Sequence, residues 1–133
     1  MHKGYVHIYM GENWKDLNTA QGMAARACGA GLRVCFYDFI DDGRLCGFAD
    51  RLTNVCIQRV EKSPQALKVA VEDAGRYDMI VLYGCDFLDD ENLRDFLTDR
   101  PKHVEVVLCG TGFSKEITEP VDLVSEIVIW IPS

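Results

Sequence analysis

The chain has 133 residues, of which 48% are hydrophobic, so it is long enough for one domain with a sizeable core and too short for two. Its formal net charge of -7 disfavours nucleic acids and anionic membrane surfaces as partners, because both repel an acidic protein. No apolar run approaches the length of a membrane span and no apolar leader opens the sequence, so we expect a soluble, cytoplasmic protein.

Apolar runs and helical stretches alternate along the first half of the chain. Residues 5–10 (Y-V-H-I-Y-M) predict a buried strand, and Gly11 then opens a short polar loop before a helix of small residues over 19–31. A second buried strand is predicted over 32–37. The run 55–60 alternates in the way that is typical of an edge strand, and the segment between these two strands has no clear periodicity.

The second half of the chain repeats this alternation. Ser63 can cap a helix that begins at Pro64 and ends at Gly75, and a third buried strand is predicted over 77–83. Asp89 starts an acidic helix turn, which the helix dipole favours. This helix has Leu93, Phe96 and Leu97 on its inner face and ends at Arg100–Pro101. The remaining predicted elements are a strand over 104–109, a short helix between Ser114 and Pro120, and a last strand over 127–131.

Near-continuous apolar strands separated by helices predict an α/β fold. We expect a single domain over residues 1–133, a three-layer sandwich in which helices cover both faces of a mostly parallel sheet. Ligands of such sheets bind at the carboxyl ends of the strands. That edge should collect the loop that Gly11 opens and residues 38–43, 83–86 and 110–113.

Two stretches of the chain carry motifs of one enzyme family. Residues 4–37 contain a strand, a Gly-led loop and the helix end A-A-R-A-C-G-A-G, and residues 77–126 contain R-P-K-H-V-E-V-V-L-C-G-T-G and E-P-V-D-L-V-S-E. In this order, the motifs resemble those of ATP:corrinoid adenosyltransferases of the CobA/BtuR/CobO type, whose patterns are A-x-R-A-x-G-x-G, R-P-x-x-x-E-V-V-x-T-G-R and A-D-L-V-[TS]-E. Relative to that family, the chain is shorter at the N-terminus and in the middle.

The resemblance implies a P-loop NTPase sheet of RecA-like architecture. It implies the use of ATP with Mg²⁺ and of a corrinoid, whose reduced cobalt receives the adenosyl group, usually within a homodimer. It also implies that Arg26, Gly110, Asp122 and Glu126 occupy family-motif positions near the site, where the two carboxylates would orient the loop after Gly110.

The loop after the first strand departs from the family pattern G-x-G-K-G-K-T-T. Asp16 stands in place of the phosphate-binding lysine, and Leu17 in place of the magnesium-binding threonine. A carboxylate there repels phosphate, since two unit charges about 4 Å apart interact by roughly 1 kcal/mol in water and by more near a protein surface. The groups that could still hold a nucleotide are Gly11, Asn13, Trp14, Lys15, Asn18 and Thr19, with Lys15 as the substitute cation.

Other family motifs depart in parallel. Tyr83-Gly84 stands where the family has an Asp-Glu pair after the third strand, although Asp86 lies close in sequence. Thr111 replaces the arginine of T-G-R, and Asp38 replaces the glutamine of Q-F-I-K-G.

Several single residues leave two interpretations open. Trp14 either stacks on an adenine, a corrin face or a partner, or folds back on the sheet edge. The run with Asp38, Asp41 and Asp42 either binds a divalent cation or is a solvated loop. No metal ligand or catalytic residue is assigned: the six cysteines lack a C-x-x-C pair and indicate reduced thiols, Cys46 and Cys56 lack zinc spacing, His7 is expected to be structural, and His103 is expected at the surface.

Three functions are compatible with this sequence. The chain could be a divergent family member that keeps nucleotide or corrinoid binding and has lost or altered catalysis. It could be an active adenosyltransferase with a non-standard nucleotide loop. It could also be a non-catalytic scaffold or interaction protein.

Overall fold

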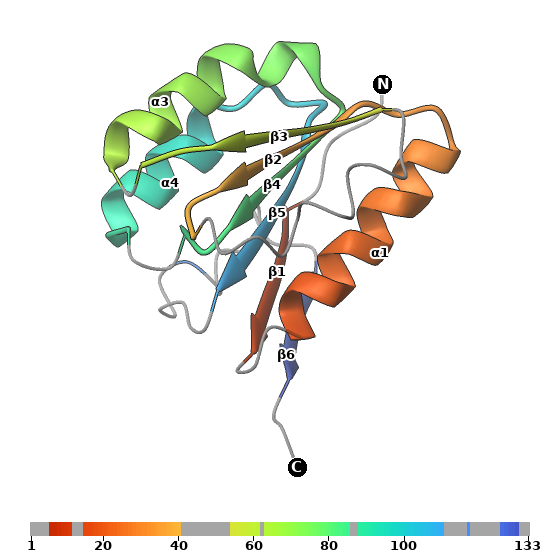
Figure 1. Cartoon of the computed structure of the whole chain (residues 1–133). Helices are drawn as coiled ribbons and strands as arrows, with labels where there is room; N and C mark the ends of the chain where they lie inside the picture. Colours follow the sequence, from red (N-terminus) through yellow and green to blue (C-terminus); the bar gives the residue numbers. More distant parts are fainter. Residues whose placement is uncertain are drawn as a thin grey trace.

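A computed structural model describes residues 6–11, 15–40, 54–61, 63–85, 88–110, 117 and 126–130. Its sheet has six strands in the order β3-β2-β4-β5-β1-β6, and every pair of neighbours is parallel (Figure 1). The strands are β1 (Val6–Gly11), β2 (Val34–Asp38), β3 (Val55–Arg59), β4 (Met79–Tyr83), β5 (Glu105–Gly110) and β6 (Glu126–Trp130). The described helices are α1 (Lys15–Gly29), α3 (Pro64–Asp73) and α4 (Asp90–Asp99), and a short 3-10 turn, η1 (Ala74–Arg76), follows α3.

The helices lie on opposite faces of the sheet: α1 on one face, and α3 and α4 on the other (Figure 1). The path of the chain explains this division. From β1 to β2 the chain moves toward the β3 edge, whereas from β3 to β4 and from β4 to β5 it moves toward the β6 edge. Because crossovers between parallel strands are right-handed, opposite directions of travel place the connecting helices on opposite faces.

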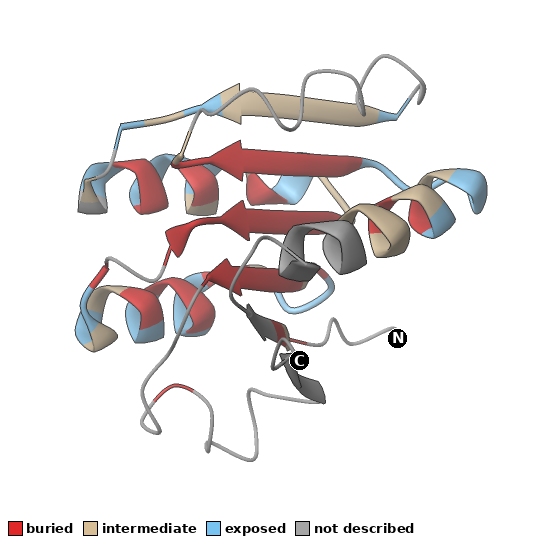
Figure 2. Ribbon diagram, turned by 60° about the horizontal axis from the view of Figure 1, so that its bottom comes forward, coloured by how far each residue is buried: buried red, intermediate tan, exposed pale blue. Residues whose placement is uncertain are grey.

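Successive residues of the central strands point to different faces and form two core clusters. On β4, Ile80 and Leu82 belong to the cluster under α3 and α4, whereas Val81 and Tyr83 belong to the cluster under α1. Both sets are buried, as the red central strands in Figure 2 show. Coverage of both faces therefore explains the continuous apolar runs, and the predicted α/β fold with a parallel sheet is confirmed.

Small side chains bring α1 close to the sheet. Ala24 is fully buried and Ala27 nearly so, and both pack against strand residues of the α1-side cluster. A larger residue at either position would hold the helix axis farther from the strands. None of the described helices combines the length and the apolar character that crossing a bilayer requires.

Strand ends differ from the predicted ones by at most two residues, and β3 is the edge strand that its alternation predicts. The predicted start of α1 at residue 19 is wrong, because the helix begins at Lys15. Its first turn, K-D-L-N, carries no apolar periodicity, so the hydrophobic pattern alone could not place this start. The helix predicted between Ser114 and Pro120 lies outside the described residues, apart from Ile117.

The caps of α3 and α4 differ in what their side chains do. The acidic turn predicted from Asp89 opens α4, and Asp89 itself is the N-cap: its carboxylate accepts a hydrogen bond of 2.9 Å from the backbone N–H of Asn92. Ser63 occupies the N-cap position of α3 with extended backbone, but its side chain makes no capping hydrogen bond. Pro64 at the first helical position supplies part of this helix start instead, since its ring already has a helical φ and it has no N–H to satisfy.

This contrast predicts unequal costs for the same kind of substitution. Asp89→Ala should lower the free energy of unfolding by about 1 kcal/mol, because it removes a capping hydrogen bond and a charge that favours the helix dipole. Ser63→Ala should cost less than about 0.5 kcal/mol, because no capping bond is lost. Urea unfolding of both variants measures the difference, and equal losses would contradict the assigned capping roles.

Candidate functional site

Two neighbouring strands, β1 and β5, end in glycines at the carboxyl edge of the sheet. Met10 pairs with Gly110, and Gly11 pairs with Trp130 on the other side. After β1 the chain enters α1 on one face, whereas Ile117, which follows β5, is buried in the cluster on the opposite face. The chain therefore diverges between the ends of β1 and β5, which is where parallel α/β sheets bind ligands.

Several predicted site residues meet at this edge. Gly11 and Gly110 end adjacent strands, and Lys15 is the first residue of α1, so the connection between Gly11 and the helix is short. Asn18 and Thr19 lie in the first two turns of the helix, and Asn13 and Trp14 lie outside the described residues. The positive end of the α1 dipole points to this edge, and that favours an anionic ligand.

Other predicted site residues do not reach this edge. Arg26 is exposed in the last turn of α1, roughly 16 Å along the helix axis from Lys15. Glu126 begins β6 and pairs with His7, so its backbone lies toward the amino end of the strands. Asp122 lies outside the described residues. The backbones of Arg26 and Glu126 therefore lie away from the strand ends at Gly11 and Gly110.

The chain also diverges between the ends of β2 and β4. At this place an apolar side chain occupies the space next to the end of β4. Tyr83 is buried, and Gly84 follows it with a positive φ of 81° and donates a hydrogen bond of 2.9 Å to the carbonyl of Cys109. Ile40, from the chain after β2, packs directly over Gly84, so that a Cβ atom at Gly84 would lie 2.6 Å from Ile40 Cδ1. Glycine is therefore required here both by the backbone conformation and by the space that Ile40 takes.

Asp38 holds Ile40 in this position. The Asp38 carboxylate is buried, and its Oδ1 accepts a hydrogen bond of 3.0 Å from the backbone N–H of Ile40. The next residue, Phe39, donates its N–H to the carbonyl of Tyr83 at 3.1 Å. The Asp38 side chain thus stabilises a turn of the backbone. Neither interpretation of the run with Asp38, Asp41 and Asp42, as a cation site or as a solvated loop, predicted this role. Asp41 and Asp42 lie outside the described residues, and across the described ranges no three His, Cys, Asp or Glu side chains gather to hold a metal ion.

The described histidines have surroundings that agree with structural and surface roles. Nε2 of His7 lies 3.8 Å from a carboxylate oxygen of Glu105 on the neighbouring strand β5. His103 is exposed just before β5, as predicted. None of the five described cysteines, at positions 28, 35, 56, 85 and 109, is joined in a disulfide.

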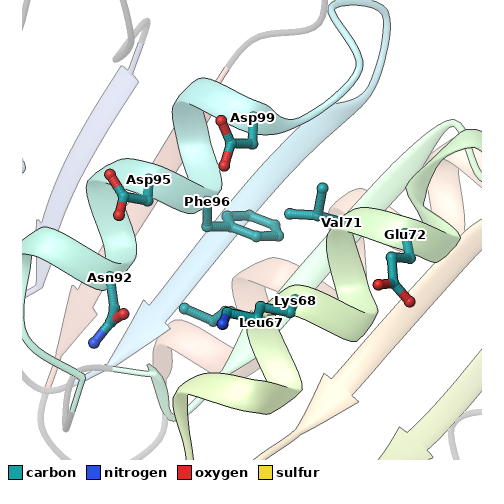
Figure 3. A pocket seen from close by; sticks show the side chains of 8 residues that line it. All are labelled: Leu67, Lys68, Val71, Glu72, Asn92, Asp95, Phe96 and Asp99. Carbon is teal, nitrogen blue, oxygen red and sulfur yellow. The ribbon is translucent and has the colours of Figure 1, made fainter.

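A groove of about 360 Å³ lies between α3 and α4, and none of the predicted site residues lines it (Figure 3). Its floor includes Leu67 and Phe96, both buried. The carboxylates of Glu72, Asp95 and Asp99 and the ammonium of Lys68 also line it. With three acids against one base, the groove repels polyphosphates, so the ends of β1 and β5 are the better candidate for a nucleotide site.

Comparison with known proteins identifies one family. The family model described as ATP:corrinoid adenosyltransferase BtuR/CobO/CobP matches residues 54–130, which is more than half of the chain. The matched part runs from the start of β3 to the end of β6, so it includes the Tyr83-Gly84 turn and Gly110. It does not include β1 or α1. No curated protein sequence matches the chain.

The contact between Ile40 and Gly84 predicts a strong effect of a single methyl group. Gly84→Ala should lower the free energy of unfolding by about 2 kcal/mol or more, because alanine is strained at this φ and meets Ile40. Gly75→Ala is the matched control, since nothing lies within 4 Å of the added methyl group, and it should be neutral or slightly stabilising. Adding Ile40→Ala to Gly84→Ala should restore part of the loss. Chemical denaturation checks all three, and equal costs at both glycines would refute the assigned contact.

Proposed function

Because this chain belongs to the ATP:corrinoid adenosyltransferase family, we propose that it is a divergent member that binds a nucleotide or a corrinoid but has lost or altered adenosyl transfer. The family reaction moves the adenosyl group of ATP to the reduced cobalt of a corrinoid. In that reaction the cobalt itself is the nucleophile, so the protein contributes binding, orientation and electrostatics. We include the homodimer that is usual for the family in this proposal.

The observation that carries the proposal is the apolar filling at the end of β4. By resemblance, Tyr83 and Gly84 take the places of the family's acidic pair, and here they are a buried aromatic residue and a glycine under Ile40. Magnesium requires oxygen ligands, and neither Tyr83 nor Gly84 brings a carboxylate to this position. This arrangement supports the absence of standard magnesium chemistry at the end of β4.

The charges at the start of α1 support the same proposal. The helix dipole contributes about half a positive charge near its N-terminus, whereas the carboxylate of Asp16 contributes a full negative charge. The dipole alone therefore does not offset Asp16, and Lys15 is needed to make this helix turn favourable for an anion. A triphosphate in the usual pose also lacks the lysine and the threonine that normally bind it and its magnesium.

The divergence of the chain at the ends of β1 and β5 supports retained ligand binding. Gly11 and Gly110 end both strands without side chains, so a ligand at this edge would meet backbone groups. An adenosine or a corrin ring requires apolar contact and hydrogen bonds to backbone groups more than it requires charge. The site is thus better suited to the uncharged parts of the family's ligands than to a triphosphate.

The first test separates binding from transfer. We expect ADP, ATP with Mg²⁺, or cobalamin to raise the thermal unfolding midpoint, because a ligand that binds only the folded state stabilises it. We expect no change in the cobalamin spectrum when the reduced cofactor is mixed with ATP at stoichiometric protein concentration. Complete adenosylation would establish the active enzyme with a non-standard loop, and the absence of any thermal shift would favour the scaffold.

The second test restores the family charges in the loop. The double variant Asp16→Lys and Leu17→Thr should bind ATP about tenfold more tightly or better, because a repulsive charge becomes attractive next to the phosphates. Asp95→Lys, which makes the same charge change on the exposed side of α4, is the matched control and should leave ATP affinity nearly unchanged. Isothermal titration measures both. An equal gain in the control would mean that only net charge matters, and no gain in the double variant would contradict the role assigned to Asp16.

A further inference from the structure

Two cysteines lie side by side on neighbouring strands. Cys35 of β2 and Cys56 of the edge strand β3 are partners in the parallel register. Both side chains lie on the α3/α4 face, where Cys35 is part of the core and Cys56 packs against it. Neighbouring strands are about 4.8 Å apart, which lies within the range of about 4.4–6.8 Å between Cα atoms that a disulfide spans.

The two thiols form a cluster with the hydroxyl groups of two tyrosines. The Cys35 thiol donates a hydrogen bond of 3.8 Å to the backbone carbonyl of Phe36, and Cys56 and the Tyr77 hydroxyl lie beside it. The Tyr37 hydroxyl lies beside Cys35 but makes no hydrogen bond of acceptable geometry within the described part of the chain. A disulfide would remove both thiol protons from this cluster, including the one that Cys35 donates to Phe36.

None of the other described cysteines stands opposite Cys35 or Cys56 in the strand register. Cys28 and Cys109 belong to the opposite face of the sheet, and Cys85 follows the end of β4, five residues beyond Ile80, the β4 partner of Cys35. Cys56 is partly exposed, whereas Cys35 is fully buried. A reagent from solution therefore reaches this pair through Cys56 first.

We propose that Cys35 and Cys56 are an oxidation site that closes to a disulfide by exchange with a small disulfide such as oxidised glutathione. The Cys56 thiolate attacks one sulfur of oxidised glutathione, and one molecule of glutathione leaves. The Cys35 thiolate then attacks Cys56 Sγ, the second glutathione leaves, and the two cysteines are joined. The protein loses two electrons and two protons, and oxidised glutathione takes them up as two molecules of glutathione.

The closing step depends on pH. Burial, with a further contribution from Cys56, raises the pKa of Cys35 to about 12. Well below that pKa, the thiolate fraction of Cys35 grows about tenfold with each pH unit, so closure should accelerate about a hundredfold between pH 7 and pH 9. The disulfide would join a central strand to the edge strand and would close a loop between residues 35 and 56. It should therefore also raise the thermal unfolding midpoint by several degrees.

The experiment treats the reduced protein with oxidised glutathione and measures thiols, mass and linked peptides. We expect the loss of two thiols per chain, a mass about 2 Da below that of the reduced protein, and a linked peptide pair that contains Cys35 and Cys56. Cys28→Ser is the matched control, because Cys28 is also partly exposed but lies on the other face, and it should leave this result unchanged. A stable glutathione adduct on Cys56 with a free Cys35 thiol, or links to other cysteines only, would overturn the proposal.

A second measurement tests the pairing without oxidation. A trivalent arsenical such as phenylarsine oxide binds two adjacent thiols, so one molecule should block both Cys35 and Cys56 in the reduced protein. Cys56→Ser, a conservative change at a partly exposed strand position, should abolish this binding and leave the Cys35 thiol unmodified. Unchanged arsenical binding in Cys56→Ser would refute the pairing, whatever the oxidation experiment gives.

Discussion

Burial of the parallel sheet on both faces is the constraint on which the rest of this structure depends. Each central strand supplies side chains to two cores, so helices must cover both sides, and right-handed crossovers decide which helix goes where. The same rule makes the chain leave β1 and β5 toward opposite faces. The position of the candidate site is therefore a consequence of how the sheet is covered, and it does not depend on which residues line the site.

Much of the fold could be predicted from the sequence because the apolar runs are nearly continuous. The predicted strands, the edge position of β3 and the acidic helix turn that follows Asp89 agree with the structure. The start of α1 at Lys15 was missed because K-D-L-N has no apolar period. The contact of Ile40 with Gly84 and the pairing of Cys35 with Cys56 depend on strand register, which a single sequence does not specify.

The chain has the fold of its family, and the residues at some of its strand ends differ from the family motifs that the sequence resembles. The match over residues 54–130 follows the strands, whose apolar pattern is needed for the core. At the end of β4 nothing in the fold requires an acidic pair, and a buried Tyr83 with Gly84 adds to the core instead. Asp38 keeps a carboxylate at the neighbouring strand end, where it fixes a turn.

The unequal charge of the two helical layers has a consequence for the approach of ligands. Together α3 and α4 carry six acidic and two basic residues, whereas α1 carries one acidic and two basic residues. The described helical layers therefore differ in charge. The acidic α3/α4 layer repels a diffusing anion more strongly than the α1 layer does. Because α1 begins at the end of β1, these strand ends lie beside the less acidic helical layer, and added salt weakens the difference in field between the two layers.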